Sequence, residues 1–339
     1  MNWCRVYLAM LLILGPGSAT AQQYLLDSLE GRVFPEETTK LALVVWAQSY
    51  AHLSVVENAE NDGNRIEQEL SKLGFTLLRT VPDASSPSDI MIRVHELQTH
   101  IAASAGPVMV VFYFAGHGFQ VEGDNYLATT SASNASTDEL LAGSVKVKEI
   151  IRKLDPRRSA SALLMMLDAC RTVRFADGKL QDFPIRDELE PGFRAGSFPT
   201  SALISTSAAP DQAARSQSSF GGDNNSPYTR ALAPLLSQKR SLDEMFKQTQ
   251  HEVLMDTGVQ YPTYLAPTWS STSFFTPPDG AEQADSRAWA NVIRNVDNIS
   301  NCAFDYLLAR PTGKFATRAE YLLASASRVP ALCSVPKEP

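Results

Sequence analysis

Two apolar segments that end in small and polar residues constrain the fold of this chain more than any other feature. They are residues 108–118, VMVVFYFAGHG, and residues 162–171, ALLMMLDACR. A short run that is apolar at every position is typical of a strand buried on both faces of a parallel sheet. Because open α/β sheets carry their chemistry beyond the carboxyl ends of such strands, we expect His117 and Cys170 just past the ends of two core strands.

A histidine and a cysteine placed in this way predict thiol chemistry. A cysteine thiol needs a base or a lowered pKa to become an efficient nucleophile, and an imidazole supplies either. His117 lies about 50 residues before Cys170, which is the spacing of the two catalytic residues in caspases. The alternatives are that Cys170 is a small buried side chain and that His117 is a core histidine satisfied by the backbone. The glycines on both sides of His117 favour a functional loop.

At these residues the chain resembles the caspase-like cysteine peptidases, specifically the bacterial relatives of metacaspases and paracaspases. The resemblance covers Lys40 to Thr276. Besides His117 and Cys170, it is carried by six segments, namely residues 41–46, 58–62, 70–75, 120–127, 203–210 and 226–232. It implies a caspase-like α/β fold with a mostly parallel central sheet flanked by helices, followed by a small C-terminal helical module.

The resemblance also implies the catalytic roles. Cys170 is the expected nucleophile and His117 the expected base and acid of a cysteine endopeptidase. The backbone amides of Gly118 and Cys170 are the expected donors of the oxyanion hole, which has to stabilise the negative charge of the tetrahedral intermediate.

Two aspartates are the predicted S1 residues, which would contact the substrate residue before the scissile bond. Animal caspases, which cut after aspartate, usually carry glutamine two positions before the cysteine, whereas this chain has Asp168, as metacaspase-like proteins do. The resemblance assigns Asp62 to the same pocket. Two carboxylates would pair with a guanidinium or an ammonium group, so we expect cleavage after Arg or Lys. The alternative is that Asp62 only caps its helix and that Asp168 only satisfies loop amides.

The chain departs from the family pattern at two places near the rim of the expected site. The family usually has Gly-Asn after the first strand, where this chain has Trp46-Ala47. The usual alanine after the helix-opening aspartate is Gly63 here.

Alternating strand and helix patterns predict a mostly parallel sheet covered on both faces. The expected strands are residues 41–46, 76–81, 108–114, 163–167 and 202–206. The expected helices are residues 61–73, 88–103, 147–154, 228–237 and 242–255.

The N-terminus has the pattern of a secretory signal peptide. Arg5 gives a positive start, residues 6–14 form an apolar run too short to span a bilayer, and residues 19–21, ATA, form a small-x-small cleavage pattern. We therefore expect a signal peptide at 1–21, a short lead at 22–39 and a periplasmic or secreted protein without a stable membrane span. Retention of the signal segment as an anchor is the alternative.

Export changes how the cysteines are interpreted. The chain has 4 cysteines, and removal of the signal peptide with Cys4 leaves an odd number, so at least one thiol is unpaired in an oxidising compartment. Cys302 and Cys333 could form a bridge, which would leave Cys170 as the free thiol that a nucleophile requires.

Composition shifts divide the rest of the chain. The expected peptidase domain spans 40–276 and includes a long, flexible loop at 172–200 that is rich in glycine and proline. A helical tail module is expected at 285–333, with helices near 288–295, 303–308 and 317–325. This module would serve either as a docking surface for a protein partner or as a cap over a sheet edge.

The composition narrows the other function classes. A hydrophobic content of 44% with 20% charged residues describes a globular protein. A net charge of −7 without a basic run argues against nucleic acid as a partner. No spacing predicts a metal site, so we expect no cofactor, with calcium dependence left open. Two other functions stay possible: a catalytically idle module that binds partners, and different thiol chemistry, such as peptide ligation, on the same two residues.

Overall fold

The computed structural model describes most of the chain between residues 38 and 325. The described residues are 38–156, 161–170, 189–190, 202–209, 214–215, 224–265, 270, 273, 275–276, 285, 288–289, 292, 298–311, 313 and 315–325. The predicted signal peptide, nearly all of the predicted lead at 22–39 and most of the predicted loop at 172–200 lie outside them.

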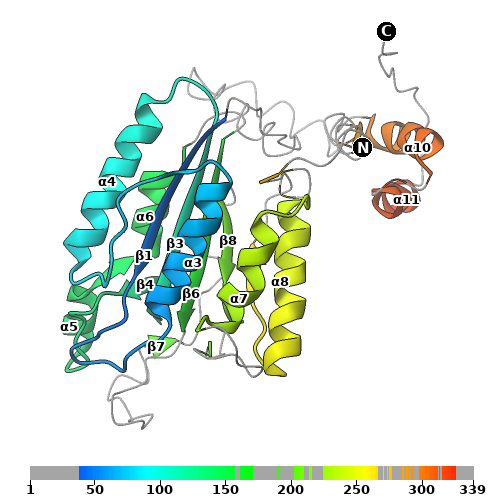
Figure 1. The fold of residues 1–339 in the computed structure, drawn as a ribbon. Coiled ribbons are helices and arrows are strands. Elements are labelled where there is room, and N and C mark those ends of the chain that lie inside the picture. The colour runs from blue at the N-terminus through cyan, green and yellow to red at the C-terminus, as the bar shows by residue number, and fades with distance from the viewer. Residues whose placement is uncertain are drawn as a thin grey trace, which may run out of the picture.

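A sheet of mostly parallel strands forms the centre of the structure (Figure 1). Its strand order is β2-β1-β3-β6-β8-β9, and only β9 in this order pairs antiparallel with its neighbour. The strands are β1 (Thr39–Trp46), β2 (Thr76–Leu77), β3 (Val108–Val121), β6 (Ala162–Cys170), β8 (Ala202–Thr206) and β9 (Thr263–Leu265). The predicted α/β class with a mostly parallel sheet is confirmed.

The far end of β3 belongs to a second, smaller set of antiparallel strands. There β3 pairs with β4 (Asp124–Ala128), β4 pairs with β5 (Ser144–Lys146), and β7 (Leu189–Glu190) pairs with β3. These three short strands and the short helix α5 (Thr137–Ala142) were not predicted from the sequence.

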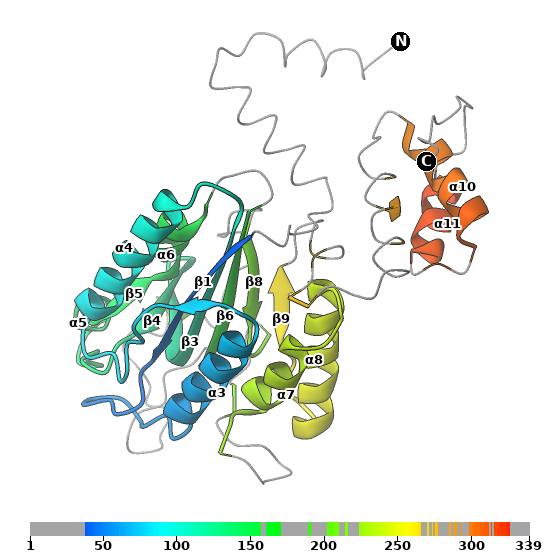
Figure 2. The same cartoon turned by 45° about the horizontal axis from the view of Figure 1, so that its top comes forward.

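Helices cover both faces of the central sheet, as Figures 1 and 2 show. One face carries α4 (Pro87–Ala103) and α6 (Val147–Leu154), and the other carries α3 (Ala59–Lys72), α7 (Pro227–Leu236) and α8 (Leu242–Thr257). Serine caps fix where several helices begin: Ser86 and Ser241 form capping boxes at α4 and α8, and Ser226 caps α7.

The alternation of side chains along the strands supplies two separate cores. Val110, Phe112 and Phe114 of β3 pack in the core beneath α4 and α6. Met109, Val111 and Tyr113 pack in the other core beneath α3, α7 and α8. A strand that is apolar at every position is therefore required for a sheet with helices on both faces.

Trp46 and Gly63, the two departures from the family pattern, lie against each other. Trp46 ends β1 and is buried in the core beneath α3, the helix that carries Gly63. A Cβ atom on Gly63 would lie 2.4 Å from Cε3 of Trp46. The indole ring thus occupies the space that an alanine methyl group at position 63 would need, so each departure accommodates the other.

The tail contains two helices with a small core of their own, α10 (Ile299–Ala309) and α11 (Ala316–Ser325) (Figure 2). They correspond to the second and third predicted tail helices. The ring of Trp289 stacks on Phe315 with centroids 5.3 Å apart. Cys302 on α10 is buried and disulfide-bonded. An ion pair of 3.3 Å between Arg318 and Asp243 connects α11 with the start of α8.

One expectation about the strand ends was wrong. His117 does not lie beyond its strand, because β3 continues to Val121, and Cys170 is the last residue of β6. The reason is that β3 keeps a partner after it leaves the central sheet, since β4 pairs with it from Gly118 onward. The two glycines and two polar residues, His117 and Gln120, among residues 115–121 made this continuation of the strand hard to recognise from the sequence.

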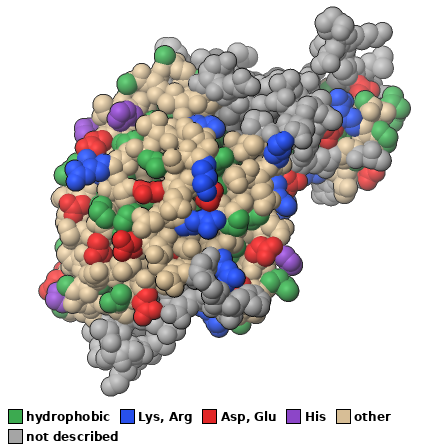
Figure 3. Space-filling model, in the orientation of Figure 1, with side chains coloured by type: hydrophobic (Ala, Val, Ile, Leu, Met, Phe, Trp, Pro, Cys, Tyr) green, Lys and Arg blue, Asp and Glu red, His purple; other side chains and the backbone are tan. Residues whose placement is uncertain are grey.

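Both signs of charge occur on the face of the molecule in Figure 3, where Lys and Arg side chains are interspersed with Asp and Glu side chains. Within the described residues, none of the helices has the length and apolar character needed to cross a membrane.

The contact between Trp46 and Gly63 predicts the effect of restoring the family's alanine. Gly63→Ala should lower the free energy of unfolding by about 1–3 kcal/mol, because the added methyl group overpacks the core. Chemical denaturation of the purified protein measures this change.

Gly106→Ala is the matched control, since a Cβ atom added there would meet no other atom within 4 Å, and it should have little effect. In a Trp46→Leu background, Gly63→Ala should cost less than in the wild type, because residues in contact couple. Equal costs in both backgrounds would contradict the account of this contact.

Candidate active site

The register of two neighbouring strands brings the predicted catalytic residues together. In the parallel pairing of β3 with β6, His117 is the partner of Cys170, and Ala115 is the partner of Asp168. Neighbouring strands lie about 4.8 Å apart, so the backbones of His117 and Cys170 are adjacent. This pairing comes at the last residue of β6.

The imidazole of His117 is buried and oriented by the loop that follows β1. Its Nε2 lies 2.7 Å from the carbonyl oxygen of Ser54 and 3.3 Å from the Ser54 hydroxyl. A carbonyl oxygen only accepts, so Nε2 carries the proton and donates it. Nδ1 then holds the lone pair of the neutral ring, and among the described residues it has no hydrogen-bond partner. Nδ1 is therefore the ring nitrogen that can accept a proton.

Tyr50 holds the backbone of His117 from the same loop. Its hydroxyl accepts a hydrogen bond from the His117 amide at 2.8 Å and donates one to the carbonyl of Ala128 at 3.1 Å. The rings of Tyr50 and His117 are 4.6 Å apart, centroid to centroid. Gly116 permits this approach, because it has φ +154° and a Cβ atom there would lie 2.7 Å from the Tyr50 hydroxyl.

Burial lowers the pKa of His117, and the hydrogen bond to Ser54 opposes part of that effect. Only 4% of the residue's surface is exposed. The protonated, charged ring is disfavoured in such a place because it loses hydration. His117 is thus a neutral base at neutral pH.

Asp62 and Asp168 meet at the N-terminus of α7. Asp62, on α3, accepts hydrogen bonds from the Asn225 side chain and from the Ser226 amide, both at 2.9 Å. Asp168, on β6, accepts a hydrogen bond from the hydroxyl of the same Ser226. Both aspartates are buried, with 2% and 7% of their surfaces exposed. Asp62 does not cap its own helix, so that part of the alternative interpretation was wrong.

Hydroxyl groups surround the carboxylate of Asp168. Thr229 donates to it at 2.8 Å, and the hydroxyls of Tyr113 and Thr229 are hydrogen-bonded to each other at 2.6 Å. Burial raises the pKa of Asp168, while the hydrogen bonds from Ser226, Thr229 and other hydroxyls work against that rise. The described hydrogen-bond donors to this buried carboxylate are uncharged hydroxyl groups. None of these donors is a cation that could balance the charge of the ionised acid.

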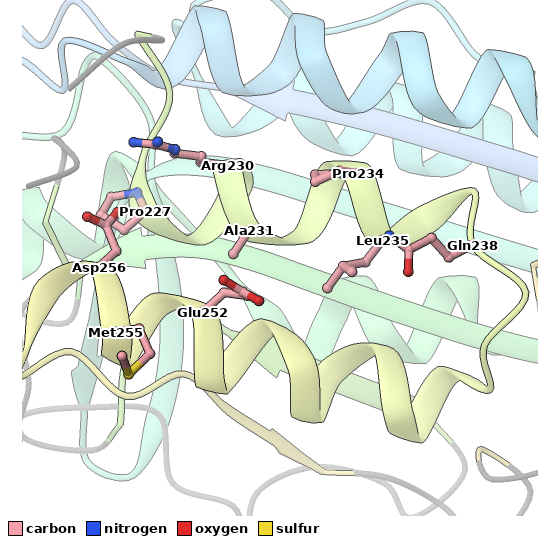
Figure 4. Close-up of a pocket in the computed structure, with 9 residues that line it drawn as sticks. All are labelled: Pro227, Arg230, Ala231, Pro234, Leu235, Gln238, Glu252, Met255 and Asp256. Carbon is pink, nitrogen blue, oxygen red and sulfur yellow. The ribbon is translucent and has the colours of Figure 1, made fainter. Parts of the chain in front are cut away.

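A separate groove of about 340 Å³ lies between α7 and α8 (Figure 4). Pro227, Arg230 and Asp256 lie at one end of it, and Leu235 and Gln238 at the other. Neither His117 nor either of the two aspartates lines this groove. It is therefore distinct from the site at the strand ends.

A family model described as a caspase domain matches residues 39–272. The chain belongs to the caspase domain family. Its α/β fold is thus caspase-like, and membership indicates cysteine peptidase activity on protein substrates.

Solved caspase structures are similar to this caspase-family chain. The Drosophila initiator caspase Dronc is 14% identical, with 74% of this chain and 86% of that chain covered and a TM-score of 0.46. Caspase-1 from Spodoptera frugiperda is 13% identical, with 74% and 93% covered and a TM-score of 0.46. A comparison with curated proteins finds no match.

The residues that orient the predicted site residues were not identified from the sequence. Tyr50 and Ser54 lie in a loop without a recognisable motif, and Asn225 carries no signal of its own. Ser226 before Pro227 is a helix-start pattern that could have been found, since serine caps helices and proline favours the first helical position. Thr229, which donates to Asp168, lies three residues after the capping Ser226.

Some predicted features stay predictions. The structure gives the backbone position of Gly118, opposite Leu127 of β4, while its role and that of Cys170 in the oxyanion hole are untested. Within the described residues, no group of three or more His, Cys, Asp or Glu side chains could hold a metal ion.

The environment of His117 predicts its titration. In a Cys170→Ala background, an NMR titration should give a pKa for His117 below the ordinary histidine value of 6.5, because burial disfavours the charged ring. A group with a lowered pKa in the folded protein opposes folding once the pH falls below its unfolded value, so stability should decrease as the pH falls below about 6.5.

A measured pKa of His117 at or above 6.5 would contradict the burial argument.

Proposed function

We propose that the chain is a cysteine endopeptidase that uses His117 and Cys170 and cleaves after Arg or Lys. The observation that carries the proposal is the pairing of His117 with Cys170 across β3 and β6, together with a buried imidazole whose Nδ1 has no partner among the described residues. Family membership supplies the coarser function, cysteine peptidase activity on proteins.

The reaction follows from these two side chains. Nδ1 of His117 takes the thiol proton of Cys170, and the sulfur attacks the carbonyl carbon of the scissile peptide bond. The imidazolium then returns the proton to the leaving amine as the C–N bond breaks, which leaves a thioester on Cys170. Water, deprotonated by His117, hydrolyses the thioester, and the thiol recovers its proton.

The backbone amides of Gly118 and Cys170 would donate to the oxyanion that forms in each half of the reaction. Tyr50 supports this arrangement indirectly, because its hydroxyl fixes the amide of His117 next to Gly118. A donor held in advance costs no reorganisation during the reaction.

Asp62 and Asp168 support the preference for a basic residue. Both carboxylates are connected through Ser226, and a guanidinium can donate to a pair of carboxylate oxygens through its fork of N–H groups. The raised pKa of Asp168 would fall again when a cation binds next to it. The ionised form, and with it the ion pair, is thus favoured by the substrate itself.

The remaining expectations form part of this proposal. The protein works in the periplasm or outside the cell after loss of residues 1–21, needs no cofactor with calcium dependence as an open alternative, and uses the helical tail to contact a protein partner. The main rival is a catalytically idle module that binds partners. A second rival is other thiol chemistry, such as peptide ligation.

Hydrolysis of fluorogenic peptides that end in Arg, Lys or Asp tests the proposal. The mature protein, with and without calcium, should cleave after Arg and Lys, and Cys170→Ala or His117→Ala should abolish the activity. Asp168→Asn should lower kcat/KM on the basic peptides about 10-fold to 100-fold, because charged hydrogen bonds contribute about 1.5–3 kcal/mol. Asp138→Asn, at an exposed position on α5, should leave kcat/KM unchanged.

The other results separate the rivals. Cleavage after Asp would retain the peptidase and overturn the role of Asp62 and Asp168. Joined peptides in the product mixture would indicate ligation. No cleavage in any condition, with Cys170 unreactive toward a thiol alkylator, would support the idle module.

A further inference from the structure

The loop after β1 determines where the imidazole of His117 lies. This loop, Gln48 to Val56, provides the Ser54 carbonyl that accepts from Nε2 at 2.7 Å and the Tyr50 hydroxyl that accepts from the His117 amide at 2.8 Å. A shift of the loop would move both contacts at once. Whatever fixes the start of this loop therefore acts on His117.

The carboxylate of Asp83 fixes that start. Its Oδ1 accepts hydrogen bonds from the backbone amides of Gln48 and Ser49, each at 2.8 Å. The carbonyl of Gln48 in turn accepts from the amides of Tyr50 and Val56, each at 3.2 Å. Asp83 therefore holds Gln48, the residue whose carbonyl connects the start of the loop with its end at Val56.

The turn that carries Asp83 is itself held by hydrogen bonds to the next residue, Ala84. The Ala84 amide donates to the Trp46 carbonyl at 2.8 Å, and the Thr130 amide donates to the Ala84 carbonyl at 2.8 Å. Thr130 also accepts from the Ala51 amide of the loop at 3.0 Å. The turn thus connects β1, the loop and the segment after β4.

Asp83 has a strained backbone. Its φ is +46°, and Glu122, with φ +49°, is the other non-glycine residue with positive φ in the described part of the chain. Strain of this kind persists where the surroundings impose it and is frequent near functional sites. Burial works to raise the pKa of Asp83, but hydrogen bonds from Ser49 and Gln48 outweigh it and leave the pKa below its ordinary value. The group is thus an ionised acceptor at neutral pH.

We propose that Asp83 is a positioning residue for His117, acting through the loop Gln48 to Val56. It does not touch the substrate, and its contribution is the acceptor that holds the amides of Gln48 and Ser49. The inference rests on the proposed function, since a positioned imidazole matters for catalysis only if His117 is the base.

Three substitutions separate the acceptor from the strain. Asp83→Asn keeps a side-chain oxygen acceptor and tolerates the left-handed backbone. Asp83→Gly also accommodates this backbone but removes the acceptor. Glu122→Gly relieves the same kind of strain at the turn between β3 and β4. Within the described part of the chain, Glu122 makes no backbone hydrogen bond to the loop, so this variant serves as the matched control.

Two readouts are needed. The first is the Nε2–H signal of His117 in protein labelled with ¹⁵N-histidine, in a Cys170→Ala background. The wild-type sequence, Asp83→Asn and Glu122→Gly should show a signal protected from exchange with water, and Asp83→Gly should lose it. The second readout is hydrolysis of an arginyl peptide, for which Asp83→Gly should lower kcat about 10-fold to 100-fold with little change in KM, while Asp83→Asn and Glu122→Gly stay near the wild type.

A protected signal and a normal kcat in Asp83→Gly would overturn the proposal. Loss of both in Asp83→Asn as well would overturn the role of the acceptor. If the wild type cleaves none of the peptides, the proposed function fails, and the NMR comparison still decides whether Asp83 positions His117.

Discussion

The parallel pairing of β3 with β6 is the constraint on which the site depends. It sets His117 beside Cys170 and Ala115 beside Asp168, so one register determines both the predicted catalytic pair and one wall of the predicted pocket. The register is secured by the apolar residues of both strands, which are buried on both faces of the sheet. A slip by one residue would exchange the two faces of the whole strand. The same strand register therefore determines both the packing of the core and the geometry of the candidate active site.

Each half of the site depends on a neighbouring segment from elsewhere in the chain. The loop after β1 orients His117 through Tyr50 and Ser54. The N-terminus of α7 joins Asp62 to Asp168 through Ser226. Polar groups buried in this way have to be hydrogen-bonded, and the site satisfies most of them internally. The Nδ1 atom of His117 is an exception among the described residues, and it is the atom that the proposed reaction needs.

The sequence was sufficient to predict the fold class and most elements of the central sheet, because the spacing of apolar residues indicates which positions are buried. The helix at 147–154 and the strand at 202–206 have the bounds that were predicted. The far part of β3 could not be predicted, since its polar residues and glycines hide a strand that is paired by β4. Tyr50, Ser54 and Asp83 could not be found either, because their roles depend on contacts between distant loops rather than on local pattern. The position of Trp46 against Gly63 explains, after the fact, two departures that the sequence alone left unconnected.

The most direct test of the central claim is covalent labelling of Cys170 by peptidyl chloromethyl ketones, followed by intact-mass and peptide-mass measurement. A reagent with arginine next to the reactive group should label Cys170 alone and faster than a reagent with aspartate there. The reaction should slow strongly in His117→Ala. Equal rates for both reagents, or a rate unaffected by loss of His117, would contradict the proposal that this imidazole and an acidic pocket act together on Cys170.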